Sequence, residues 1–379
     1  MRVFLSFFRR SPFCVLFIVT SAFWLPAASQ TAGLSFDELV SGANSAREQN
    51  DPARAIELYT RALQVNPKWP DGWWFVGSLE YRTGAYAEAQ DALSHYIELT
   101  SDPGPALGLR GLCKFEIGDY TGAVADIEKG ISLGAANDPR NEQILRYDEA
   151  LALTRLGRFQ DALKSYSYLA QNKITSPELI IAIGLAGLRM SLLPKDMPDD
   201  QQPLVEAAGS ATFQFMSGDE PGARKTFEEL FRRFPDARNA HYLYGYLLFN
   251  TDADSALAEF RRELEVQPTN TEAAVMGARI LLLRNRAAEA LPFAQKAVAQ
   301  EPNSAAAELV LGQALSDGGD VHGSIEHLEH ALKLEPDNLE VHIALAKSYS
   351  RSGRKDDARR ERLLCLQLTN PDAATSPSP

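Results

Sequence analysis

One short stretch of the 379-residue sequence carries the residue types that bind metal ions. It reads VHGSIEHLEH and contains His322, His327 and His330 together with Glu326 and Glu329. Imidazole and carboxylate groups are ligands of zinc, and a catalytic zinc helix has the order His-Glu-x-x-His. That order is absent from the stretch, and on a helix His327 and His330 are expected to point outward. We therefore interpret the stretch as a solvated helix face and expect no metal site.

A glycine-rich stretch, GPALGLRG at residues 104–111, has the composition of a phosphate-binding loop. Such a loop follows a strand and opens a helix, and the sequence predicts no strand before it. The pattern also brings no Ser, His and Asp, and no Cys and His, into a nucleophilic set. We expect neither a cofactor nor catalysis.

The three cysteines do not form a disulfide framework. Cys14 lies in an N-terminal apolar segment, and Cys113 and Cys365 are too far apart in the repeat described below to pair. Both are expected to act as small apolar residues.

The first 29 residues have the pattern of a secretory signal peptide. Three arginines precede an apolar run at residues 13–25, and small residues at 27–29 precede the expected cleavage site. An uncleaved anchor is the alternative, but the run is shorter than the roughly 20 residues that span a bilayer. Pro12, after the pair Arg9-Arg10, favours the ordinary secretory route over twin-arginine export. The sequence thus predicts an exported protein of the bacterial envelope, periplasmic or secreted, with no membrane span after cleavage.

The charge balance bears on the class of partner. The chain has 38 Lys and Arg against 50 Asp and Glu, a net charge of −12. A negative field repels phosphate backbones, so nucleic acid is not expected as a partner.

A 34-residue period organises the rest of the chain. Pro268, Pro302 and Pro336 lie 34 residues apart, and each closes an amphipathic stretch. This period is typical of repeated helix pairs. Small residues recur at position 8 of each first helix and position 20 of each module, where two helices must approach closely. The packing residues predicted there are Gly77, Gly111, Gly184, Gly245, Gly312, Ala55, Ala89, Ala123, Ala162, Ala223 and Ala290.

These positions resemble the tetratricopeptide repeat family over residues 36–372. One module carries Trp73, Val76 and Gly77 of the family pattern, although Glu80 replaces the usual aromatic residue. The resemblance implies a right-handed superhelix of helix pairs, a groove lined by the first helices, and binding of another protein without catalysis.

The module register divides the all-α solenoid into two arrays. Residues 36–193 hold four modules and a half, because the helix expected at residues 177–193 has no second helix after it. Residues 194–203 are rich in proline and aspartate and form a connector. Residues 204–372 hold five modules, and residues 373–379 are expected to be disordered.

Positions 5, 9 and 12 of a first helix share one face, which we expect to line the groove. Aromatic side chains and arginine are the types that anchor protein interfaces. The alternative is that these aromatic residues pack between adjacent first helices. The Lys and Asn clamp by which some family members hold a terminal carboxylate is absent, so apolar or aromatic segments are the expected ligands. The candidates are Trp74, Ser78, Tyr81, Arg82, Tyr147, Tyr242, Tyr246 and Phe249.

The last module is basic and includes Arg359, Arg360 and Arg362. Long basic side chains give a terminal repeat a wettable face; the alternative is an electrostatic dock for an acidic partner. The favoured function is an exported, non-catalytic scaffold that binds an extended or helical segment of another envelope protein. The rival is an assembly component that uses its convex face or its hinge, and the third reading is the regulatory module of an enzyme.

Overall fold

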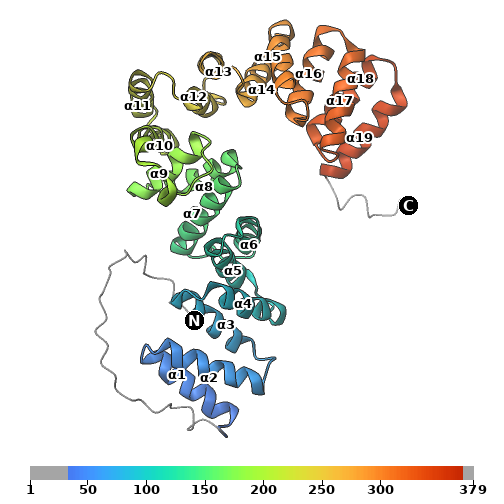
Figure 1. The fold of residues 1–379 in the computed structure, drawn as a ribbon. Coiled ribbons are helices and arrows are strands. Elements are labelled where there is room, and N and C mark those ends of the chain that lie inside the picture. Colours follow the sequence, from blue (N-terminus) through green and yellow to red (C-terminus); the bar gives the residue numbers. More distant parts are fainter. Residues whose placement is uncertain (1–32, 370–379) are drawn as a thin grey trace. The chain divides into compact units, whose positions relative to one another are not determined.

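The computed structural model describes residues 33–369, which form nineteen α-helices and no strand (Figure 1). This confirms the predicted all-α array of helix pairs. The chain divides into two compact units. Unit 1 runs to Ile174 and includes residues 191–193, and unit 2 comprises Thr175–Met190 and the residues from Pro194 onward. The predicted signal peptide, residues 1–29, and the predicted tail, residues 373–379, lie outside the described residues.

Unit 1 is a row of helix pairs in which each helix packs against the next one in the sequence (Figure 1). Its helices are α1 (Phe36–Glu48), α2 (Pro52–Val65), α3 (Pro70–Thr83), α4 (Tyr86–Leu99), α5 (Gly104–Glu116), α6 (Tyr120–Ser132), α7 (Pro139–Arg155) and α8 (Phe159–Gln171).

Unit 2 opens with a single helix and two 3₁₀ turns before its helix pairs begin. Its elements are α9 (Pro177–Gly187), η2 (Pro194–Asp196), η3 (Asp199–Gln201), α10 (Gln202–Met216), α11 (Glu220–Arg233), α12 (Ala240–Leu248), α13 (Ala253–Val266), α14 (Thr271–Leu283), α15 (Ala287–Gln300), α16 (Ala305–Gly318), α17 (Val321–Leu334), α18 (Leu339–Arg351) and α19 (Lys355–Thr369).

Small residues lie where the two helices of a pair cross. A Cβ atom added at Gly312 would lie 2.5 Å from Leu328 Cγ and 3.1 Å from the carbonyl oxygen of Ser324. A Cβ atom at Gly111 would lie 2.6 Å from Ile127 Cγ1. Any larger side chain would separate the two axes, which is why the period carries a residue without bulk. Similar contacts occur at Gly77 and Gly245, and the second-helix residues Ala55, Ala89, Ala123, Ala162, Ala223 and Ala290 are fully buried.

A glycine and an aspartate form several of the turns inside the pairs. Gly118 has φ 85°, a left-handed conformation that glycine adopts without strain. The next residue, Asp119, caps α6 by accepting a hydrogen bond from Gly122 N at 2.9 Å. This order ends one helix and starts the next within a few residues. Aspartates cap further second helices at Asp51, Asp219, Asp252 and Asp320.

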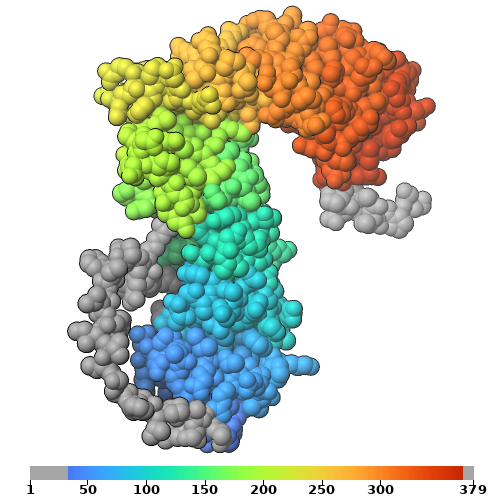
Figure 2. Space-filling model, viewed as in Figure 1, coloured from blue at the N-terminus to red at the C-terminus, as the bar shows by residue number. Residues whose placement is uncertain are grey.

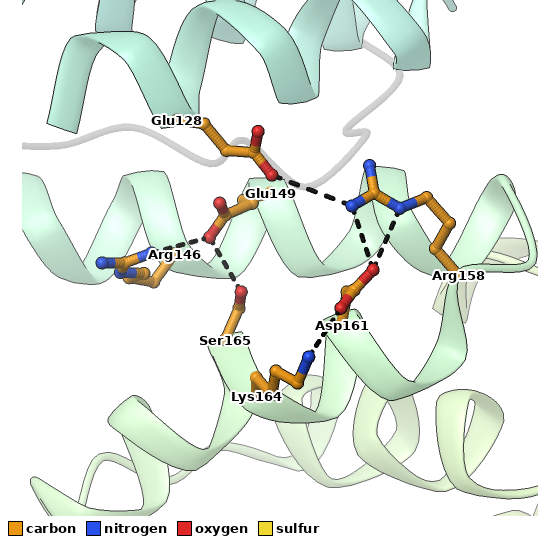
Figure 3. Close-up of polar contacts among 7 residues, drawn as sticks. All are labelled: Glu128, Arg146, Glu149, Arg158, Asp161, Lys164 and Ser165. Carbon is orange, nitrogen blue, oxygen red and sulfur yellow. Dashed lines mark hydrogen bonds and ion pairs between the residues drawn. The ribbon is translucent and has the colours of Figure 1, made fainter. Parts of the chain in front are cut away.

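Buried polar side chains also join helices within unit 1. Glu149 of α7 is 3% exposed and accepts hydrogen bonds from Ser165 of α8 at 2.8 Å and from Arg146 at 3.2 Å (Figure 3). Nearby, Arg158 forms an ion pair with Asp161 at the start of α8 (Figure 3). A buried carboxylate is tolerated only when partners replace its hydration, so these contacts fix the relative position of α7 and α8.

The position of α9 differs from the sequence expectation. The helix ends at Gly187 rather than at residue 193, and Arg189 follows with φ 60°. Its partner is α10: a Cβ atom at Gly184 would collide with the carbonyl group of Val205, and one at Gly209 with that of Ile180. The two glycines allow α9 and α10 to pack closely. In this way α10 takes the place of the second helix that the repeat pattern would put directly after α9.

The boundary between the two units therefore differs from the one that the sequence predicted. It precedes α9, at residues 174 and 175, rather than falling at residues 194–203. The connector contains two 3₁₀ turns, and α10 begins at Gln202. Residues 191–193 stay with unit 1, where Arg155 Nη1 donates a hydrogen bond to the carbonyl oxygen of Ser191 at 2.6 Å.

Across residues 33–369, every helix is too short or too polar to traverse a bilayer.

Candidate protein-interaction surfaces

The first candidate surface lies on α3 in unit 1 and consists of Trp74, Ser78, Tyr81 and Arg82; we call it the α3 wall. The first three side chains are half-buried and Arg82 is exposed. Trp74, Ser78 and Tyr81 are spaced i, i+4 and i+7, and Arg82 lies four residues after Ser78, so the four residues share one side of the helix. The structure therefore brings together all four residues that the sequence predicted in this module.

Tyrosines of α4 support the aromatic residues of the α3 wall. The Trp74 ring lies 5.4 Å from that of Tyr96, and the Tyr81 ring lies 5.6 Å from that of Tyr86 in an edge-on arrangement. Such ring pairs hold each aromatic group in one orientation while part of its surface stays accessible. The aromatic rings of the wall are therefore held in fixed positions with part of their surface exposed.

Polar groups give the α3 wall its hydrogen-bonding capacity. Burial raises the pKa of Tyr81 well above its usual value, with the charges of Asp148 and Glu116 adding to the effect. The phenol therefore stays protonated at neutral pH and can donate a hydrogen bond. Arg82 reaches back toward the preceding pair, where its Nη2 donates to Asn50 Oδ1 at 3.4 Å.

Tyr147 is separate from the α3 wall. It is half-buried on α7, and its ring lies 6.4 Å from the ring of the fully buried Tyr166. Its surroundings are those of a packing residue of its own helix pair.

The second candidate surface, on α12 in unit 2, is less accessible than the sequence suggested. Tyr242 is only 3% exposed: its ring packs on those of Phe260 and Tyr246, and the Arg189 guanidinium lies 5.5 Å from its centroid. Tyr246 and Phe249 are half-buried. The predicted groove role of Tyr242 is therefore corrected, because this side chain packs between helices.

A buried carboxylate caps the start of α12. Glu263 of α13 is fully buried and accepts hydrogen bonds from the backbone N–H groups of Asn239 and Tyr242, at 2.8 and 3.1 Å, at the start of α12. Asn270 also donates to Glu263, and Asn239 has φ 64°. An anion at a helix N-terminus is favourable, so Glu263 acts as a cap supplied by the next helix. Sequence reasoning missed this residue.

Ion pairs occupy the equivalent face of the later helices in unit 2. Arg279 of α14 donates to both carboxylate oxygens of Glu340 of α18, at 2.8 and 2.9 Å. Lys347 of α18 forms an ion pair with Asp317 at 2.7 Å. Both of these cations are thus paired with carboxylates of the same chain.

The histidine stretch differs from its predicted solvated face. His322 is largely exposed, but His327 Nδ1 and His330 Nδ1 lie 2.6 and 3.0 Å from the two carboxylate oxygens of Glu308 on α16. Glu308 is 3% exposed. His327 and His330 thus point toward the first helix of their module, so the predicted outward orientation of these two residues is wrong. No group of three or more metal-ligating side chains occurs among residues 33–369.

Two further histidines form buried pairs with glutamate inside helix pairs of unit 2. His241 Nδ1 lies 2.6 Å from Glu259 Oε2, and His342 Nδ1 lies 2.6 Å from Glu361 Oε2. His342 Nε2 also lies 2.9 Å from the carbonyl oxygen of Pro336. Both of its ring nitrogens thus lie within hydrogen-bond distance of an oxygen atom. The pairs replace apolar packing between the helices of one module.

The glycine stretch and the cysteines carry no reactive group. Residues 104–111 lie within α5, and Gly111 contacts α6. Cys113 is fully buried, and burial raises its thiol pKa to about 12. Cys365 is half-buried, and both cysteines are free. A thiol whose pKa is raised in this way is a poor nucleophile at neutral pH.

Comparisons with known proteins agree with this architecture. One tetratricopeptide repeat model matches residues 41–104, 217–253 and 246–305, and a second matches residues 315–361. The TPR repeat-containing protein MJ1428 of Methanocaldococcus jannaschii is 22% identical over 322 residues, 84% of this chain and 54% of that protein. The chain thus spans about half the length of this curated relative.

Solved structures with similar folds include MamA proteins. A crystal structure of MamA is 18% identical with a TM-score of 0.40, covering 43% of this chain and 96% of that one. MamA 41-end from Desulfovibrio magneticus RS-1 is 22% identical with a TM-score of 0.39, covering 48% and 99%. The repeated helix pairs, their small crossing residues and the family matches lead to one conclusion: the chain belongs to the tetratricopeptide repeat family.

Proposed function

We propose that the protein is an exported, non-catalytic scaffold that uses the α3 wall to bind an extended or helical segment of another protein. Its family is one of protein-interaction scaffolds. The observation that carries the proposal is the combination of two half-exposed aromatic residues, Trp74 and Tyr81, with the exposed Arg82 on one helix face. These are the residue types that dominate interface energies.

The equivalent face of unit 2 is a weaker candidate for the same role. Tyr242, Val275 and Leu309 are 3%, 7% and 4% exposed, and Arg279 is paired with Glu340. A ligand would have to displace these contacts before it reached the helices. The α3 wall needs no such displacement.

The chemistry of the α3 wall indicates the class of ligand. Its aromatic rings offer apolar area at small entropic cost, and the Tyr81 phenol and the Ser78 hydroxyl add hydrogen-bonding groups. One arginine that already contacts Asn50 is a poor receptor for a strongly anionic tail. We therefore assign the wall to a segment with apolar or aromatic side chains at helical or extended spacing.

The proposal that the protein is exported is supported by the sequence alone. Arginines, an apolar run and small residues occupy residues 1–29 in the order of a signal peptide. Fractionation of cells that produce the full chain, with N-terminal sequencing of the exported form, tests this part separately. A mature N-terminus near Gln30 supports export, and retention of the whole chain in the cytoplasm contradicts it.

The test of the α3 wall is a capture experiment with matched variants. Trp74→Ala with Tyr81→Ala removes the two anchors, and Tyr246→Ala removes a half-buried aromatic residue from unit 2. We expect the first variant to lose the protein that the unaltered chain captures and Tyr246→Ala to retain it. Circular dichroism should show equal helicity in all three proteins. Unchanged capture by the Trp74 and Tyr81 variant contradicts the proposal and favours an assembly role for another surface.

A further inference from the structure

A second surface, independent of the α3 wall, lies on α19. Leu363 and Leu366 are 54% and 62% exposed and lie about one turn apart on this helix, at the red end of the described chain in Figure 2. Single exposed leucines are common on protein surfaces. This pair, however, lies on the side of α19 that corresponds to the side of α17 on which α18 packs.

The repeat defines that face. In α17 the residues Ile325 and Leu328 are 6% and 0% exposed, and they belong, with the partly buried Leu332, to the cluster that packs α17 against α18. The residues 34 positions later on α19 are Arg359, Arg362 and Leu366. On the corresponding face of α19, Leu363 and Leu366 are 54% and 62% exposed, so no helix of residues 33–369 covers that face. A helix can therefore dock there with the same geometry as the next repeat.

The charges on α19 specify the occupant. Lys355, Arg359, Arg360 and Arg362 are all exposed. The helix has three acidic residues: Asp356 is exposed, Glu361 is buried against His342, and Asp357 pairs with Arg354 and Arg360. They compensate the basic residues only in part. Among the described residues, Arg359 has no hydrogen bond or ion pair. A basic rim around two leucines is complementary to an acidic amphipathic helix.

Other occupants fit this face less well. A second α19 would place Arg359 and Arg362 against the same cations. The exposed residues of α1 are Asp37, Glu38, Ser41, Ser45 and Glu48, so a second copy would bring carboxylates but no large apolar side chain to the leucines. Residues 370–379, NPDAATSPSP, contain no large apolar residue.

We propose that the face formed by Arg359, Arg362, Leu363 and Leu366 docks an acidic amphipathic helix of another protein, which takes the place of the next repeat. The leucines supply the apolar contact and the two arginines select for carboxylates along the edge of the incoming helix.

The test uses the full chain and two labelled helical peptides, each of about 18 residues with leucine on one face. One peptide carries glutamate on the flanks and the other carries lysine. Fluorescence anisotropy at low salt should show saturable binding of the acidic peptide only. Arg359→Glu with Arg362→Glu should weaken that binding by about 10-fold or more and transfer preference to the lysine peptide.

Matched variants separate docking from diffuse attraction. Arg360→Glu changes the same charge on the same helix away from the docking face, and its affinity should stay within about twofold of that of the unaltered chain. Leu363→Ser with Leu366→Ser should weaken binding by about 10-fold while keeping the charge. The proposal is overturned if the acidic peptide does not bind, if the leucine variant binds as well as the unaltered chain, or if Arg360→Glu weakens binding as much as the double charge reversal. It is also overturned if the same substitutions abolish self-association of the chain, which would assign the face to a second copy.

Discussion

Glu80 is expected to make the free energy of unfolding depend on pH. It replaces the usual aromatic residue of its module, and it lies on α3 directly before the wall residue Tyr81. Its Oε2 atom is buried without a hydrogen-bond partner among the described residues. Burial, together with the charges of Glu88 and Asp91, raises its pKa from 4.5 to about 7. We predict that Glu80→Gln stabilises the protein at alkaline pH.

The sign and size follow from linkage. Because the folded pKa is raised, the folded state holds this proton more tightly than the unfolded chain does. The resulting stability is fully present below pH 4.5 and is lost as the pH rises through about 7. The shift corresponds to about 3 kcal/mol, and partial solvation of the side chain reduces the expected effect to about 2 kcal/mol. Glutamine removes the charge and hence this penalty.

Urea unfolding of the unaltered chain and of Glu80→Gln, followed by circular dichroism at about pH 5 and about pH 8, measures the effect. The variant should gain about 2 kcal/mol at the higher pH and much less at the lower one. Glu88→Gln, a change to an exposed neighbour on α4, should gain far less. A loss of stability in Glu80→Gln at the higher pH, or a gain that is equal at both, would refute the assignment of a destabilising buried charge.

Three further changes probe the packing. Gly312→Val should destabilise unit 2 by about 3 kcal/mol, since its Cβ has no room at the helix crossing; a change below about 0.5 kcal/mol in urea unfolding would argue against close packing. Arg110→Met should cost about 3 kcal/mol at neutral pH. Burial alone would raise the pKa of Asp126, but its hydrogen bonds, including those from Arg110, hold the pKa below its usual range, so the cost should shrink as acid protonates the carboxylate. A double-mutant cycle of His342→Gln and Glu361→Gln should give a coupling energy of about 2 kcal/mol, and strict additivity would show that the pair does not interact.

The repeat pattern predicts the helix pairs because their crossing is controlled by local sequence. A glycine or alanine is required wherever two axes meet, so Gly111 and Gly312 mark the crossings in the sequence as they do in space. The α3 wall follows from the same register, since spacing along a helix decides which side chains share a face.

The identity of the side chains that meet between helices could not be predicted in this way. Nothing in the sequence indicates that Phe260 and Arg189 cover the Tyr242 ring. The packing of α9 on α10 could be predicted only if Gly184 and Gly209 were known to face each other. The sequence shows both glycines but not that they meet. The pairing of Glu308 with two histidines was missed because His327 and His330 were expected to point outward. A glutamate among the small and apolar residues of the first helix was the available signal.

Site-specific photocrosslinking tests the α3 wall most directly. A photoreactive phenylalanine analogue replaces Tyr81 in the full chain, and the matched control carries it at the exposed Glu98 of α4. Binding at the wall predicts a crosslink to one partner protein from position 81, lost when Trp74→Ala is added, and none from position 98. Equal crosslinking from both positions, or a crosslink at position 81 that persists with Trp74→Ala, would contradict it.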